Sequence, residues 1–160
     1  NVVPDILTSA KGLGGGFPIG AMLAKEAWAQ VFQPGTHGTT FGGNPLAATV
    51  ANAVLAHLDA PLLAGVGERH ALIVDQLNAI SARYDAFSAV RGTGLLIGAE
   101  LAGPLRGKAK TLTNLAAEEG LIALIAGPDV LRFAPALNIP LADIAEAFVR
   151  LDRAVARLTR

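Results

Sequence analysis

The sequence predicts a protein of mixed α/β or α+β class, because short strand-like segments alternate with segments of helical periodicity. Apolar runs bounded by glycine and proline, such as residues 130–133, have the length of strands. The 160 residues are 52% hydrophobic and 16% charged, which excludes an intrinsically disordered chain. The C-terminal part has apolar residues at spacings of three and four, as one face of a helix requires: Ile144, Phe148, Leu151, Val155 and Leu158.

In the first third of the chain, strands and helices are expected to be joined by glycine-rich loops. The apolar pair Ile6–Leu7 begins one strand-like run, and residues 18–24 have the character of another. Residues 25–33 are expected to form one or two helical turns. Asn44 before Pro45 is typical of a helix start, so we expect a helix from there to about Leu58.

In the remainder of the chain, the break at Asp59-Ala60-Pro61 predicts a domain boundary near residues 59–66. The arginines of the last helix lie mostly on its polar side and are expected to form a solvated face. The other expected elements are helices at about 67–84 and 108–119, two strands within 86–101, and short strands at 121–125 and 130–133.

The composition of the chain excludes several classes of function. Lysine plus arginine and aspartate plus glutamate number 13 each, and a neutral chain is not expected to bind nucleic acid. No apolar run reaches the roughly 18–20 residues of a membrane span, so no membrane partner is expected. The absence of cysteine excludes a thiol nucleophile and fits the cytoplasm. The chain opens at Asn1 without a methionine, and we expect a part of a longer protein.

Lys11 is the first candidate for chemistry. It follows a strand-like apolar run and precedes the glycine run Gly14-Gly15-Gly16. A lysine at a strand end can be partly desolvated, which lowers its pKa and frees the amine as a nucleophile for Schiff-base chemistry with pyridoxal phosphate. An ordinary surface lysine is the alternative, which the spacing alone leaves open. The glycine run itself implies close approach to the backbone.

Thr39 and Thr40 lie in a second glycine-rich loop, where two hydroxyls and nearby backbone N–H groups would suit a phosphate. A structural loop with turn-forming threonines is the alternative. No complete dinucleotide or P-loop motif is present. His37, His57 and His70 have no metal-ligand spacing, so no metal site is expected.

Arg132 stands within an apolar strand-like segment, Leu131-Arg132-Phe133. A buried or cleft-facing arginine needs a carboxylate partner. The sequence leaves two partners open, a substrate carboxylate and an internal Asp or Glu.

Two long motifs, TSAKGLGGGFPIGAMLA and HGTTFGGNPLAA, closely resemble the class III, pyridoxal-phosphate-dependent aminotransferases. The segments 90–98 and 132–135 extend the resemblance, which covers essentially the whole chain in the family's order. Within the family, the sequence is most similar to the acetylornithine and succinylornithine aminotransferases of arginine metabolism.

The resemblance implies a role for each candidate residue. Lys11 would bind pyridoxal 5'-phosphate covalently and then move the proton between substrate carbon and cofactor. Thr40 would bind the cofactor phosphate from the neighbouring subunit of a homodimer with a shared active site, and Thr39 would touch the acylated ornithine. Arg132 resembles the arginine that recognises a substrate carboxylate or pairs with a carboxylate gate.

The resemblance also implies the type I fold of pyridoxal-phosphate enzymes, similar to aspartate aminotransferase and of α/β class. Residues 1–60 would be the end of the large cofactor domain, and residues 61–160 the small C-terminal domain. The implied reaction transfers the δ-amino group of an acylornithine to 2-oxoglutarate, giving glutamate. The family's pyridine-binding Asp, ring-stacking aromatic and other glycine loop lie upstream of the lysine, and no such segments occur here, so we expect these 160 residues alone to be inactive.

Two alternatives stay open. Another class III aminotransferase would act on ornithine, 4-aminobutyrate or another ω-amine. A non-catalytic α/β chain would be kept for dimer contacts or binding, although neither Lys11 nor the threonine pair is needed for that.

Overall fold

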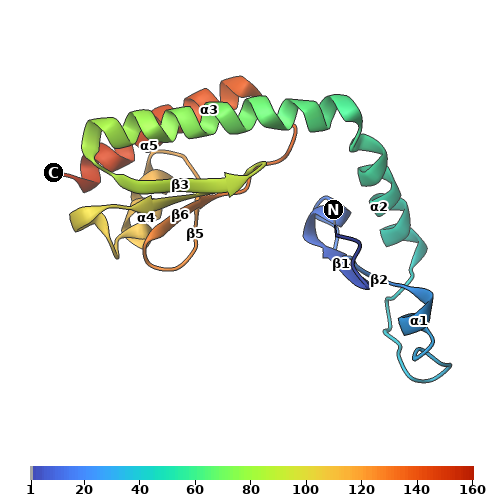
Figure 1. Cartoon of the computed structure of the whole chain (residues 1–160). Coiled ribbons are helices and arrows are strands. Elements are labelled where there is room, and N and C mark those ends of the chain that lie inside the picture. The colour runs from blue at the N-terminus through green and yellow to red at the C-terminus, as the bar shows by residue number, and fades with distance from the viewer. Residues whose placement is uncertain (1) are drawn as a thin grey trace. The chain divides into compact units, whose positions relative to one another are not determined.

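The computed structural model describes residues 2–160, which divide into two compact units between Asp59 and Ala60 (Figure 1). The first unit runs from the N-terminus to Asp59, and the second from Ala60 to Arg160. The sequence predicts a boundary between large and small domains at residues 60 and 61. The identity of the two units with those domains stays a prediction.

The first unit begins with an antiparallel hairpin. Strand β1 (Ile6–Ala10) pairs with β2 (Gly20–Ala24), and the register places Ile6 opposite Ala24 and Ala10 opposite Gly20. A short 3-10 helix, η1 (Lys11–Gly14), follows β1 directly. The hairpin therefore places Lys11 at the first position after a strand.

Two helices complete this unit, the short α1 (Glu26–Ala29) and the longer α2 (Pro45–His57). The predicted start of α2 is confirmed, since the Asn44 side-chain oxygen accepts a hydrogen bond of 2.8 Å from the backbone N–H of Ala47. Asn44 also donates from its amide nitrogen to the Phe41 carbonyl at 2.8 Å, which ties the end of the glycine-rich loop to the helix. The cap thus positions both the loop and α2.

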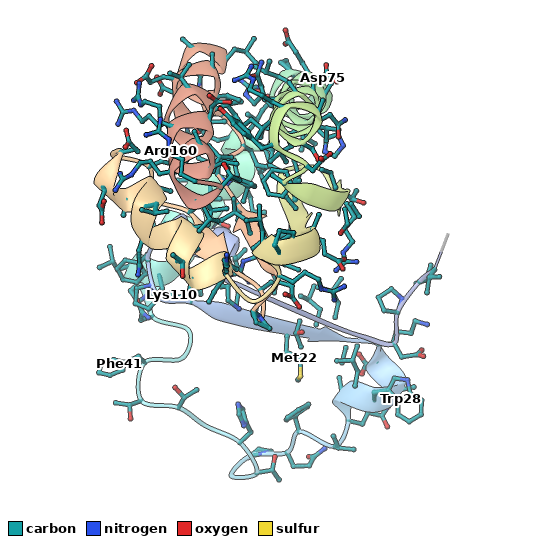
Figure 2. All side chains as sticks on the ribbon, turned by 90° about the vertical axis from the view of Figure 1, so that its left-hand side faces the viewer. Met22, Trp28, Phe41, Asp75, Lys110 and Arg160 are labelled. Carbon is teal, nitrogen blue, oxygen red and sulfur yellow. The ribbon has the colours of Figure 1, made fainter. Side chains whose placement is uncertain are left out.

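Much apolar surface of the first unit is exposed. Figure 2 shows Trp28 on α1 and Phe41 on the following loop, and their exposed fractions are 54% and 79%. Both strands of the hairpin also carry exposed apolar residues, Ile6 and Leu7 on β1 and Met22 and Leu23 on β2. A two-stranded hairpin has little stability of its own in water, because it cannot bury enough of such surface.

The second unit consists of a four-stranded antiparallel sheet and three helices (Figure 1). The strands are β3 (Phe87–Thr93), β4 (Leu96–Leu101), β5 (Leu124–Ile125) and β6 (Val130–Phe133), in the spatial order β3-β4-β6-β5. The helices are α3 (Ala60–Tyr84), α4 (Ala109–Glu118) and α5 (Leu141–Leu158), and a 3-10 turn, η2 (Gly103–Leu105), lies between β4 and α4.

The core of the second unit lies on one face of this sheet. Ile97, Ala99 and Leu101 of β4 are buried, whereas the intervening residues Gly98 and Glu100 are partly exposed. This alternation is the period of two that a strand with one covered face requires. The buried strand residues form one cluster with residues of all three helices, and α3 and α5 lie along one side of the sheet in Figure 1.

Helix α3 begins earlier than the sequence predicts. The expected start near Gly67 is wrong, because the helix begins at Ala60. Pro61 suggests a helix stop, yet it lies in the first turn, where a missing N–H breaks no intrahelical hydrogen bond. Gly65 and Gly67 are then tolerated inside the helix because the long apolar face beyond them is packed into the core.

The arginines of α5 lie on its solvent-exposed side, as the sequence predicts, and they also form ion pairs there. Arg153 donates to Glu119 at 3.0 Å, and Arg157 contacts both Glu119, at 2.8 Å, and Glu118. These glutamates lie at the end of α4, so the pairs join two helices that are adjacent in the fold. Sequence periodicity places the arginines on a polar face but does not show which acidic residues lie opposite.

Within residues 2–160, each helix taken singly is too short or too polar to cross a membrane, and α2 with α3 passes that test only when the two are counted as one broken span.

The Leu77→Ala variant is expected to lower the free energy of unfolding by about 2–5 kcal/mol, because it opens a cavity in the core. Leu77 is 0% exposed on α3. Leu63, on the same helix, is 54% exposed, and Leu63→Ala is the matched control, with an expected change below about 1 kcal/mol. Equal losses in urea denaturation of the two variants would contradict this core.

The ion pairs between α4 and α5 predict a pH-dependent stability. The hydrogen bond from Arg157, followed by that from Arg153, holds the pKa of Glu119 below its ordinary value, against a partial desolvation that raises it. A carboxyl with a lowered folded-state pKa stabilises the fold above its unfolded pKa, about 4.3, and loses that effect as the pH falls through the folded value. Glu119→Gln is therefore expected to unfold at lower denaturant than the wild type at pH 7.

This difference is expected to shrink as the pH falls below about 4, where the glutamate becomes protonated in the wild type too. Glu68→Gln, on the exposed surface of α3, serves as the control and is expected to change little at either pH. A Glu119→Gln effect that is constant from pH 7 to pH 3 would show that charge pairing is not its cause.

Candidate active site

Lys11 lies directly after the last residue of β1 and is exposed. Among residues 2–160, no ion pair or hydrogen bond of its side chain is found. By contrast, Lys25, at the end of β2, pairs with Asp5 at 2.8 Å. The amine of Lys11 is therefore free to react with a ligand.

The backbone of Lys11 is strained. Its φ of 51° lies in the left-handed region, which it shares with one other non-glycine residue of the described chain, Asp85. Such a conformation costs a side-chain-bearing residue on the order of 1–3 kcal/mol, and it is found where the surrounding structure enforces it. Here it occurs at the turn from β1 into η1.

The glycines after Lys11 allow this turn to pack against the rest of the first unit. A Cβ at Gly14 would lie 2.7 Å from the Ile19 side chain, and one at Gly15 would lie 3.0 Å from Val54 of α2. Gly15 also has a φ of 56°. The sequence predicts close approach to this glycine run, and the groups that approach it are the chain's own Ile19 and Val54.

Thr39 and Thr40 are both exposed in the loop before α2. The Thr39 carbonyl accepts a hydrogen bond of 3.3 Å from the N–H of Gly42, so the loop turns sharply after the pair. Thr39 lines a hollow of about 400 Å³ together with Asn44 and residues 18–20. Neither Lys11 nor Thr40 lines that hollow, so the three predicted residues of this unit do not share it.

Arg132 belongs to the second unit, in β6. It lies opposite Gly98 of β4 and Leu124 of β5. Its neighbour Leu131 is buried under the helices, so the alternation of the strand places Arg132 on the other face of the sheet. The sequence identifies this arginine but not the face that it occupies.

The environment of Arg132 is that of a cation without a partner. Its Nε atom is buried, and within the described residues no hydrogen-bond acceptor reaches it. Arg132 is also among the residues that line a hollow of about 300 Å³, but the apolar residues that line it include Ile73 of α3 and Phe148 of α5, on the helix-covered side of the sheet. A buried polar atom without a partner is costly, so an anionic ligand here would supply what the chain does not. An internal Asp or Glu partner, one of the two that the sequence leaves open, is not found among residues 2–160.

One ion pair close to Arg132 is not predicted from the sequence. Arg91 of β3 contacts Glu100 of β4 at 3.1 Å, on the same face of the sheet as Arg132. The two residues lie within segments predicted to be strands, but their contact depends on the register, which no sequence pattern here specifies.

Comparison with known proteins now identifies the family. The sequence profile of the family Aminotransferase class-III matches residues 1–155. The chain belongs to the class-III aminotransferases. The α/β class and the type I fold predicted from the sequence are thereby confirmed.

Curated relatives of this aminotransferase chain have names from acylornithine metabolism. The chain is 69% identical over 157 residues to a succinylornithine transaminase of Photorhabdus laumondii. The aligned region covers 98% of this chain and 39% of that relative. It is 54% identical over 160 residues to an acetylornithine/succinyldiaminopimelate aminotransferase of Yersinia pestis. That alignment covers 99% of this chain and 40% of the relative. The chain thus spans about two-fifths of the length of these relatives.

Solved structures of other aminotransferases have the same fold. N-acetylornithine aminotransferase from Stenotrophomonas maltophilia matches 98% of this chain with a TM-score of 0.89 and 44% identity, over 41% of its own length. Ornithine aminotransferase from Plasmodium yoelii matches 98% of the chain with a TM-score of 0.85 and 30% identity, over 42% of its length.

Proposed function

We propose that the protein containing this chain transfers the δ-amino group of N2-acetylornithine or N2-succinylornithine to 2-oxoglutarate, yielding the semialdehyde and glutamate. Pyridoxal 5'-phosphate is the cofactor, and the reaction belongs to arginine metabolism in the cytoplasm. The observation that carries the proposal is the free amine of Lys11, held at a strand end by a strained backbone, in a class-III aminotransferase chain. The 69% identity to a succinylornithine transaminase supports the substrate class.

The chemistry of the donor set fits the cofactor. An aldehyde-bearing cofactor requires a primary amine without a competing carboxylate, and Lys11 has no such partner among residues 2–160. A phosphate requires hydrogen-bond donors, which the exposed hydroxyl of Thr40 and the backbone of its loop supply. When bound, pyridoxal phosphate supplies an electron-withdrawing ring that stabilises negative charge on the substrate carbon.

Each candidate residue of this chain then has a separate role in the reaction. Lys11 would hold the cofactor, and its Nζ would move the proton from the substrate Cδ to the cofactor C4′, as a general base and acid. Thr40 binds phosphate oxygens, and Thr39 contacts the acylated substrate. The protein is a homodimer in which Thr40 serves the site of the neighbouring subunit.

Arg132 binds a carboxylate of the substrates. Its unpaired Nε favours a ligand that has a carboxylate. Acylornithine, glutamate and 2-oxoglutarate all have one. A guanidinium is suited to this task because its fork of N–H donors matches the two oxygens of a carboxylate.

In the full-length protein, Lys11→Ala is expected to lower the rate of transamination by at least about 10³-fold, because both the covalent attachment and the proton transfer are lost. Lys110→Ala, on the exposed side of α4, is the matched control and is expected to keep full activity. Borohydride reduction followed by peptide mapping gives a second readout, with a phosphopyridoxyl adduct on the Lys11 peptide of the wild type alone. Unchanged activity and cofactor attachment in Lys11→Ala would favour the non-catalytic alternative.

Residues 1–160 by themselves are expected to show no turnover of acetylornithine with 2-oxoglutarate. The resemblance to the family assigns the group that holds the pyridine nitrogen, the stacking aromatic and a second phosphate loop to segments that this sequence lacks. The apolar side chains exposed on the hairpin would also favour aggregation of the isolated chain. Robust turnover by the 160 residues, with the full-length protein assayed in parallel, would refute this.

A second candidate function is transamination of ornithine itself, because the Plasmodium yoelii ornithine aminotransferase matches the chain with a TM-score of 0.85. Other ω-amines such as 4-aminobutyrate form the same class of substrate. Substrate profiling of the full-length protein separates these from acylornithine: a higher kcat/KM for the free amino acid would replace the first proposal.

A further inference from the structure

The sheet of the second unit carries two arginines on the face that the helices leave open. The register places Arg91 of β3 opposite Gly98 of β4, and Gly98 opposite Arg132 of β6. The three residues therefore form one row across three strands. Since glycine has no side chain, nothing on the middle strand separates the two arginine side chains.

Glu100 lies on the same face and is the diagonal neighbour of both arginines. It pairs with Ala89 on one side and Val130 on the other, and these residues are two positions away from Arg91 and Arg132 along their strands. Diagonal neighbours on one face are about 7–8 Å apart between backbones, within reach of long side chains. By register alone, the Glu100 carboxylate is able to pair with either arginine.

The structure shows which pairing is made. Glu100 lies 3.1 Å from the Arg91 guanidinium, and its side chain is 27% exposed. Arg132 has no ion-pair partner among the described residues, and its Nε is buried without an acceptor. The carboxylate that would otherwise neutralise Arg132 is thus occupied by Arg91.

We propose that Arg91 is a positioning residue, which holds Glu100 away from Arg132 and so keeps the Arg132 guanidinium available for a substrate carboxylate. The inference rests on the proposed function of Arg132. Without Arg91, the partly buried Glu100 carboxylate gains more from pairing with Arg132 than from remaining unpaired. It then competes with the substrate for the same guanidinium.

The backbone at Gly98 supports this arrangement. A Cβ there would lie 3.1 Å from the Val130 side chain, so the site tolerates a larger residue only if Val130 shifts. Any such side chain would also stand between the two arginines. Gly98 therefore leaves space between the two arginines, in which the Glu100 side chain reaches Arg91 and a carboxylate ligand approaches Arg132.

The test is the KM for 2-oxoglutarate of the full-length protein. Arg91→Met is expected to raise this KM by about three- to tenfold while kcat changes less than about twofold, because an internal ion pair of modest strength must be displaced. Adding Glu100→Gln to Arg91→Met is expected to return the KM to the wild-type value, since the competing charge is gone. Arg91→Lys, which keeps a cation beside Glu100, is expected to stay close to the wild type.

Arg83→Met is the matched control. Arg83 lies on α3, pairs with Asp152 and is similarly exposed, at 59% against 66% for Arg91. It is expected to leave the KM unchanged. A KM that rises in Arg91→Met and is not restored by Glu100→Gln would overturn the proposal, because it would show a loss of sheet structure and not competition. An unchanged KM in Arg91→Met would overturn it as well.

Direct binding of 2-oxoglutarate, measured by titration calorimetry on the same variants, separates this proposal from the proposed function. If the wild type binds 2-oxoglutarate but does not use acylornithine, the substrate assignment is refuted, and the role of Arg91 is still decided by comparing 2-oxoglutarate binding among the same variants.

If Arg91→Met does not fold, Arg91→Gln is used in its place. It is expected to bind 2-oxoglutarate more weakly than the wild type, and adding Glu100→Gln is expected to restore the affinity. Failure of that restoration refutes the role of Arg91.

Discussion

The second unit depends on the burial of one face of its four-stranded sheet under α3, α4 and α5. Ile97, Ala99 and Leu131 are buried beneath these helices, so the alternating residues of the same strands must lie on the opposite face. Arg132 is on that face for this reason. A slip of one residue in the register would bury the guanidinium in the apolar core, at a cost that no partner there could offset.

In the first unit, the corresponding constraint is the tight turn after β1. Lys11 has a left-handed backbone, and Gly14 and Gly15 let the turn pack against Ile19 and α2 without steric conflict. A strained residue persists only where its surroundings stabilise the fold by more than the strain costs. The glycines therefore support the position of Lys11.

Two sets of ion pairs in the second unit depend on the fold and not on the local sequence pattern, unlike the Arg150–Glu146 pair within α5. Glu119 pairs with Arg153 and Arg157 across two helices, and Glu100 pairs with Arg91 across two strands. Each carboxylate has its partner more than eight residues away, so helical periodicity cannot find it. Arg132, by contrast, has no carboxylate partner among residues 2–160, and its buried Nε has no acceptor there.

The sequence by itself determined the elements and the family. Periodicity predicted most helices and strands, Asn44 predicted the start of α2, and two long motifs placed the chain among the class III aminotransferases. It missed the start of α3, because Pro61 has the same appearance at a helix start and at a stop. Only the tertiary structure decided the strand register, and hence which residues share a face, because pairing between distant segments depends on packing against the helices and not on local propensity.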